Sequence, residues 1–142
     1  MNRGHTLLEL ALVLLILSLV GGMGVGLSRH STDRLAVAQA REEAAALFHH
    51  ARAEARLRGG ARVEVGSDGR LALWVGGDEA IEVVDPSRVG VRVEIVGSRE
   101  EASVVFGPMG IGRAASLTLR FERGRAESSL VISSYGRLRR GP

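Results

Sequence analysis

The sequence predicts an α+β protein, in which a long amino-terminal helix packs on an antiparallel β-sheet. Three observations predict this: a nearly unbroken apolar run over residues 7–27, a helix-favouring segment over residues 33–58, and a change to alternating apolar and polar residues after Gly60. Apolar residues recur every three or four positions in an amphipathic helix and every two in a half-buried strand. A chain of 142 residues has room for one small domain and one appendage.

The apolar run has the length of a membrane span. Its 21 residues would reach roughly 30 Å as a helix, which is the thickness of the hydrocarbon core of a bilayer. It is too long for a secretory signal peptide, and no A-x-A cleavage site follows it. A plain transmembrane anchor fits, and Arg3 favours a cytoplasmic amino terminus. Neither interpretation explains Glu9, because a carboxylate in lipid costs several kcal/mol and normally faces a partner.

The segment 33–58 is rich in Ala, Glu, Arg and Leu and contains neither Gly nor Pro. We expect Thr32 or Asp33 to cap its start and Gly59-Gly60 to end it. His49 and His50 are adjacent, so they point to different faces, and we expect both on the surface. The stripe predicted to lie across a sheet contains Leu35, Ala38, Ala44, Leu47, Phe48, Ala51, Ala55 and Leu57.

The remainder of the chain predicts six or seven strands. Gly-rich turns separate the first three, and a short Gly124-Arg125 turn joins the last two. In the stretch SLTLRFER, the residues Leu117, Leu119 and Phe121 are expected to face inward. The predicted strands are 61–65, 70–75, 79–84, 91–96, 102–106, 116–123 and 127–134.

The composition argues against catalysis. The chain has no cysteine, which excludes disulfides, thiolate metal sites and a cysteine nucleophile. Its acidic pairs are most simply solvated, and its histidines are not spaced as metal ligands. We therefore expect no enzymatic activity, no catalytic residues, no metal and no cofactor. All 19 basic residues are Arg, and they are unevenly spread: residues 59–112 hold five Arg against nine acids, residues 113–142 seven against two.

The order G-H-T-L-L-E-L at residues 4–10 resembles the class III leader of type IV pilins and type II secretion pseudopilins. That resemblance implies cleavage by a membrane prepilin peptidase between Gly4 and His5, followed by methylation of the new amino terminus at His5. His5 stands where the family usually has Phe. The resemblance also gives Glu9 a partner, the α-amino group of the neighbouring subunit, with which it pairs as the filament assembles.

The body of the chain resembles the GspH/FimT pseudopilin subfamily. The stretch FHHARAEARLRGGARVEV (48–65) is similar to its helix-to-strand junction, FGPMGIGR (106–113) to its F-x-P-x-G loop, and YGRLRR (135–140) to its terminal G-R-x-R. The implied organisation is a leader (1–4), a transmembrane and filament-core helix (5–28), an amphipathic helix continuing into the globular part (29–60), and a periplasmic antiparallel β domain (61–142).

The resemblance implies a minor pseudopilin of a type II secretion system. Such a subunit is inserted once in the bacterial inner membrane with its carboxyl-terminal domain in the periplasm, and then joins a filament. Its partners are the prepilin peptidase, the inner membrane and other pilin or pseudopilin subunits. One alternative is a single-pass membrane protein with a periplasmic β domain and no filament role.

The other alternative is a FimT-like minor type IV pilin that binds DNA for transformation. Guanidinium groups suit bidentate contacts with phosphates, and the tail carries Arg137, Arg139 and Arg140. On an extended strand the first two would share a face and Arg140 would lie opposite. The same arginines could instead solubilise the chain end or contact the acidic 59–112 region of another subunit.

Overall fold

The computed structural model describes residues 7–113 and 116–141, and for residues 7, 8 and 19–29 it describes the backbone without the side chains. The chain divides into two compact units, residues 1–32 and residues 33–142. The predicted cleavage and methylation positions, Gly4 and His5, lie outside the described residues.

Helix α1 (Leu7–Arg58) contributes residues to both units. In the first unit, Glu9 lies in the first turn, and every large apolar side chain from Leu10 to Leu17 is between 50 and 64% exposed. Within the part of the chain that the structure describes, no stretch of helix is both long and apolar enough to cross a bilayer.

In the second unit, the helical residues 33–58 end where predicted but do not begin there. Gly59 has φ +87° and its amide donates to the carbonyl of Ala55 at 2.9 Å, which closes the helix in the left-handed conformation that Gly adopts without strain. The predicted cap at Thr32 or Asp33 is wrong, because α1 runs through both positions. The Asp33 carboxylate instead lies 3.0 Å from Arg123 Nε.

The buried face of this helix is made mostly of alanine. Leu35 and Leu57, predicted to be in the stripe, are 70% and 79% exposed. Leu35 comes one residue before Ala36, the first buried residue, and Leu57 comes two residues after Ala55, the last one. At 3.6 residues per turn these offsets are about 100° and about 200° around the helix axis, so both leucines point away from the buried residue nearest to them. The buried residues are Ala36, Val37, Ala40, Ala44, Ala45, Leu47, Phe48, Ala51 and Ala55.

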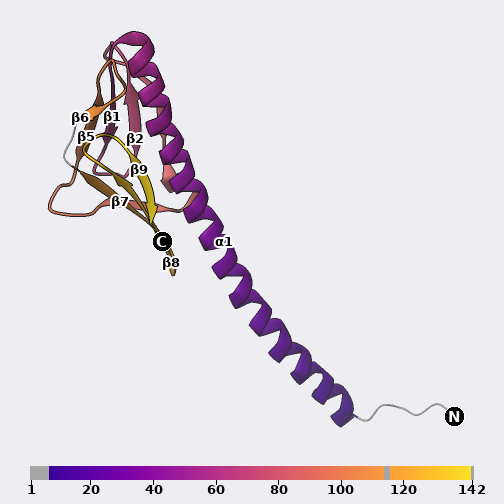
Figure 1. Cartoon of the computed structure of the whole chain (residues 1–142). Helices are drawn as coiled ribbons and strands as arrows, with labels where there is room; N and C mark the ends of the chain where they lie inside the picture. Colours follow the sequence, from indigo (N-terminus) through magenta and orange to yellow (C-terminus); the bar gives the residue numbers. More distant parts are fainter. Residues whose placement is uncertain (1–6, 114–115, 142) are drawn as a thin grey trace. The chain divides into compact units, whose positions relative to one another are not determined.

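The described strands form two antiparallel sheets (Figure 1). The first has the order β3-β2-β1-β5-β6 and the second β4-β7-β8-β9. A short 3₁₀ helix, η1 (Pro86–Val89), precedes β4. The strands are β1 (Ala61–Val65), β2 (Leu71–Trp74), β3 (Ala80–Val84), β4 (Arg92–Ile95), β5 (Ala102–Phe106), β6 (Gly112–Arg113), β7 (Leu117–Arg123), β8 (Ala126–Ile132) and β9 (Leu138–Gly141).

The predicted fold class is confirmed, since a helix packs on antiparallel strands. All seven predicted strands are present, although they divide between two sheets, and β6 and β9 are additional. Leu117, Leu119 and Phe121 of β7 are buried as predicted. The helix face and the inner faces of both sheets form one continuous core, so neither sheet has a core of its own.

Candidate functional site

The carboxyl-terminal strand β9 is the edge of the second sheet, and its arginines point to opposite faces. Arg139 pairs across from Val131 of β8, and Arg140 across from Leu130. Leu130 is fully buried, and directly opposed residues share a face of the sheet. Arg140 therefore lies on the face turned toward the core, and Arg139 on the outer face. The alternation predicted for these two residues is what the strand shows.

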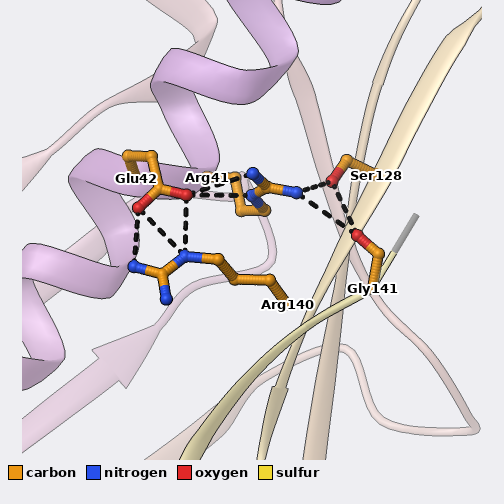
Figure 2. Close-up of polar contacts among 5 residues, drawn as sticks. All are labelled: Arg41, Glu42, Ser128, Arg140 and Gly141. Atoms are coloured by element: carbon orange, nitrogen blue, oxygen red, sulfur yellow. Dashed lines mark hydrogen bonds and ion pairs between the residues drawn. The ribbon is translucent and has the colours of Figure 1, made fainter.

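Arg140 is held by Glu42 of α1 through a forked ion pair (Figure 2). Its Nε donates to Glu42 Oε1 at 2.8 Å and to Oε2 at 3.1 Å, and its Nη2 donates to Oε2 at 2.8 Å. The hydrogen bond from Arg140, with a further one from Arg41, lowers the pKa of the Glu42 carboxyl, and the same contact raises the pKa of Arg140. Two residues 98 positions apart in the chain are thus joined.

Arg41 completes the attachment of the tail. Its Nη1 donates to Ser128 Oγ at 2.8 Å and to the Gly141 carbonyl at 3.3 Å, while its Nη2 donates to Glu42 Oε1 at 3.1 Å. Ser128 is a buried polar residue, and this bond satisfies its hydroxyl. We name these five residues, Arg41, Glu42, Ser128, Arg140 and Gly141, the tail clamp; it fastens β9 to the helix (Figure 2).

Two loops that contain the motifs noted in the sequence lie against each other: residues 107–111, between β5 and β6, and residues 133–137, between β8 and β9. The Gly112 amide, after the loop 107–111, donates to the Tyr135 carbonyl at 3.2 Å. A Cβ on Gly136, which has φ +76°, would lie 2.7 Å from Phe106 Cε1 and 3.2 Å from Gly112 N. Arg52 of α1 donates to the Gly136 carbonyl. Because the backbones touch at two glycines, neither position has room for a side chain.

Between these loops and the helix lies a groove of about 710 Å³. We name it the loop groove. Met109, Ile111 and Tyr135 in it are 77%, 47% and 71% exposed. Its remaining lining includes three arginines, two from α1 and one from the tail, together with Gly110 and Ser133. The arginines are Arg52, Arg56 and Arg137.

The loop-groove arginines differ from most of the other arginines whose side chains the structure describes. Arg52 and Arg56 donate to backbone carbonyls, of Gly136 and Met109 respectively. Among the residues that the structure describes, no carboxylate forms an ion pair with Arg52, Arg56 or Arg137, whereas nine other arginines have such a partner. The groove therefore combines exposed apolar side chains with positive charge that the described part of the subunit leaves uncompensated.

The three tail arginines do not form one patch. Arg137 lines the loop groove, Arg139 is exposed on the outer face of the second sheet, and Arg140 belongs to the tail clamp. Sequence reasoning did not include Arg52 or Arg56, which enter the site because one helical turn places them beside loops more than 50 residues away. Spacing along the helix was the available signal, since residues four apart share a face.

His50 contacts two carboxylates on the other side of the helix. Its Nδ1 lies 2.6 Å from Glu82 Oε2 on β3, and its Nε2 lies 3.5 Å from Glu54 Oε1. The hydrogen bond with Glu82 raises the pKa of His50. His49 is exposed, as predicted, and His50 is exposed as well but joins the helix to the edge of the first sheet.

Comparisons with known proteins identify related chains. The sequence model of a family described as "Type II transport protein GspH" matches residues 39–136, more than half of the chain. The type IV minor pilin FimU of Pseudomonas aeruginosa PAO1 has a similar structure in two crystal forms. For the first crystal form, the TM-score is 0.60 and the sequence identity is 20%, and the similar region covers 77% of this chain and 90% of the FimU chain. For the second, the TM-score is 0.56 and the identity is 19%, and the similar region covers 73% of this chain and 91% of the FimU chain. No curated protein sequence gives a significant match.

The glycine contact between the two loops predicts a large effect of a single methyl group. Gly136→Ala places a Cβ against Phe106 in a left-handed backbone conformation, and we expect the free energy of unfolding to fall by about 2–4 kcal/mol. Thermal unfolding of the purified chain measures it. Gly77→Ala is the matched control, because its φ is not positive and its Cβ would meet no atom within 4 Å. Equal melting temperatures for the two variants would contradict the packing argument.

The tail clamp predicts a local effect of Glu42→Gln. The amides of β9 should exchange with solvent about fivefold faster, and global stability should fall by less than about 1 kcal/mol, because the ion pair is exposed. Hydrogen exchange followed by mass spectrometry measures the exchange rates of the β9 amides and of the core amides in the same sample. Glu43→Gln is the control. In the native chain Glu43 accepts a hydrogen bond from Gln39 of the same helix, so its replacement should leave the exchange rates of β9 unchanged.

The same ion pair has a defined pH dependence. The folded-state pKa of Glu42 lies below its ordinary value of 4.5, so its stabilising contribution is present above that value and is lost as the pH falls through the lower, folded-state pKa. The difference between the native chain and Glu42→Gln should accordingly be constant near neutral pH and shrink in acid. A difference that persists unchanged in acid would show that Glu42 acts through its shape rather than its charge.

Proposed function

Because the chain belongs to the family of the type II transport protein GspH, we propose that it is a minor pseudopilin, a structural subunit of a type II secretion filament. The family match across residues 39–136, which covers nearly all of the globular unit, carries this proposal. The pilin-type fold, a helix on antiparallel strands, is consistent with it. The role is mechanical rather than enzymatic: the subunit contributes a helix to a filament and displays its sheets.

The amino-terminal part of α1 supports a place in lipid and then in a filament. Its large apolar side chains from Leu10 to Leu17 are exposed in the isolated chain, and so many exposed apolar side chains need a covering surface. We infer that residues 5–28 insert once in the bacterial inner membrane, with the carboxyl-terminal unit in the periplasm. The prepilin peptidase then cleaves between Gly4 and His5 and methylates His5, and the mature helix packs among those of neighbouring subunits.

Glu9 would be the fifth residue of the mature chain. A carboxylate in an apolar surrounding is costly unless a positive charge neutralises it. The free α-amino group created by cleavage supplies such a charge when it belongs to the adjacent subunit. The same carboxylate would then favour assembly over a monomer dispersed in lipid.

Replacement of this carboxylate separates insertion from assembly. We expect Glu9→Val to remain in the membrane fraction and to lose its place in sheared filaments, since the apolar run is preserved and the charge pairing is lost. Leu12→Val is the control and should assemble normally. The mass of the mature protein in the same samples reports cleavage after Gly4. Filaments that contain Glu9→Val at the native level would refute the pairing, and a chain that retains its first four residues would refute the processing.

A second candidate function, DNA binding by a type IV minor pilin, rests on a different observation. Arg137 and Arg139 are exposed, and no carboxylate among the described residues forms an ion pair with either. Residues 113–142 hold seven Arg against two acids. Arg140 contributes less to this candidate, because its guanidinium fork is occupied by Glu42.

Salt dependence tests the second candidate. If Arg137 and Arg139 contact phosphates, changing both to Ala should weaken DNA binding and reduce the slope of log affinity against log salt by about two, roughly one for each lost contact. Arg140→Ala should change the affinity and the slope less, because Arg140 already pairs with Glu42. Arg120→Ala is the control, since Arg120 pairs with Glu127 at 3.0 Å. If the native chain fails to bind DNA even at low salt, this candidate is excluded and the secretion subunit remains.

A further inference from the structure

Two separate surfaces of the globular unit carry charges of opposite sign that form no ion pair with a described residue. The loop groove presents Arg52, Arg56 and Arg137 without a carboxylate partner among the described residues. Asp78 and Glu79, in the turn between β2 and β3, are exposed and form no ion pair with a described residue. Most charged side chains elsewhere in the globular unit pair within the chain, so these two groups are candidates for pairing between chains.

Both surfaces also expose apolar side chains beside their charges. Ile81 and Val83 of β3, directly after the acidic turn, are 47% and 56% exposed. We name Asp78, Glu79, Ile81 and Val83 the hairpin surface. β3 is an edge strand, whose outer backbone groups are available to a neighbour. The loop groove offers Met109, Ile111 and Tyr135 as the apolar counterpart. The two surfaces are therefore opposite in charge, and each exposes apolar side chains beside its charges.

The two surfaces lie at opposite edges of one sheet. In the first sheet the order is β3-β2-β1-β5-β6, so β3 forms one edge, and the loop 107–111 that joins β5 to β6 lies at the other. The helix gives the same placement. His50 reaches β3 through Glu82, and Arg52 reaches the loop groove; residues two apart on a helix point about 200° apart. A subunit cannot bring its own hairpin surface into its own groove.

We propose that the loop groove of one subunit binds the hairpin surface of a second copy of this chain. The arginines of the groove pair with Asp78 and Glu79 of the neighbour, and Ile81 and Val83 cover the exposed apolar side chains of the groove. Because the two surfaces differ and lie at opposite edges, the contact is head-to-tail, and it leaves a free groove and a free hairpin surface at the two ends. Such a contact builds open chains rather than closed dimers.

This inference rests on the proposed role as a filament subunit, for which it supplies a lateral contact between globular units. It is independent of Glu9, which acts through the amino-terminal helix. A chain that assembles in a Glu9-dependent manner but lacks the lateral contact would refute this inference and leave the proposed function standing. A lateral contact in a chain that shows no Glu9-dependent assembly would support this inference and refute the proposed filament role.

Disulfide cross-linking of the full chain tests the contact, and the absence of native cysteine makes each introduced thiol a specific reporter. Gly77→Cys marks the hairpin surface without removing an acid, and its Cβ meets no atom within 4 Å. Met109→Cys marks the groove without removing an arginine. After mild oxidation in detergent, a mixture of the two single variants should form dimers, and a chain carrying both changes should form a ladder of dimers, trimers and larger species.

The controls decide between contact geometries. Ser67→Cys, in the exposed turn between β1 and β2, should link to Met109→Cys at no more than about one tenth of the Gly77→Cys yield, which excludes random encounters in a micelle. Each single variant oxidised by itself should stay monomeric. Efficient dimers from one single variant would indicate a symmetric contact and overturn the proposal, as would equal yields with Ser67→Cys and Gly77→Cys.

Charge reversal tests the pairing itself. Arg56→Glu in the groove-marked chain should lower the cross-linking yield at least about tenfold, because like charges then face each other. Adding Asp78→Arg to the hairpin-marked chain should restore much of it, and high salt should weaken the native pairing. A yield insensitive to both reversals would overturn the electrostatic basis of the contact. Transfer of the cross-link to a different pilin-type protein in cells would show that the second copy is not the occupant.

Discussion

The fold depends on one surface, the alanine-rich face of α1 within residues 33–58. Six of its nine buried residues are alanine, and side chains this small let the strands approach the helix closely. Leu47 and Phe48 are the bulkiest fully buried side chains of this face and help to fill the core. Since the core is continuous across helix and sheets, neither sheet could bury its inner face without the helix. The positions of the tail clamp and of the loop groove follow from this packing, because each site includes helix side chains that flank the buried face: Arg41 and Glu42 in the clamp, Arg52 and Arg56 in the groove.

Local pattern was sufficient wherever an element is defined by its own neighbours in sequence. The alternation of β7 and the Gly59 stop of the helix were predicted from residues at those positions, and both are confirmed. The centre of the predicted helix stripe, from Ala44 to Ala55, is buried as predicted, but its two ends were placed incorrectly because Leu35 and Leu57 were weighted above smaller neighbours such as Ala36. In this chain alanines make up most of the buried face, and Leu35, next to the buried Ala36, faces solvent.

What the sequence could not predict depends on contacts between distant residues. β9 has no alternating apolar pattern; it is a strand because it pairs with β8 and because Arg140 meets Glu42 98 positions away. β6 has two residues, one of them Gly, and exists because β5 lies beside it. The loop groove is formed by three segments that are distant in sequence, namely α1, the loop 107–111 and residues 133–137. Nothing in the sequence around Arg52 and Arg56 indicates which loops they contact. The motif likeness at 106–113 and 135–140 indicated that both loops mattered, but not that they touch.

The uneven charge along the chain acquires a structural meaning from the sheet topology. Strands β1, β2, β3, β5 and β6 all fall within residues 61–113 and make the first sheet, whereas β7, β8 and β9 come from residues 117–141 and make most of the second. The acid-rich and arginine-rich segments thus become different sides of one body. Within it, intramolecular pairs such as Glu42–Arg140 consume part of the charge, and what remains is segregated by position. A body with segregated charge of both signs orients its neighbours, since approach in the wrong orientation brings like charges together. For a subunit that must join others in one register, this distribution matters more than the net charge of +3.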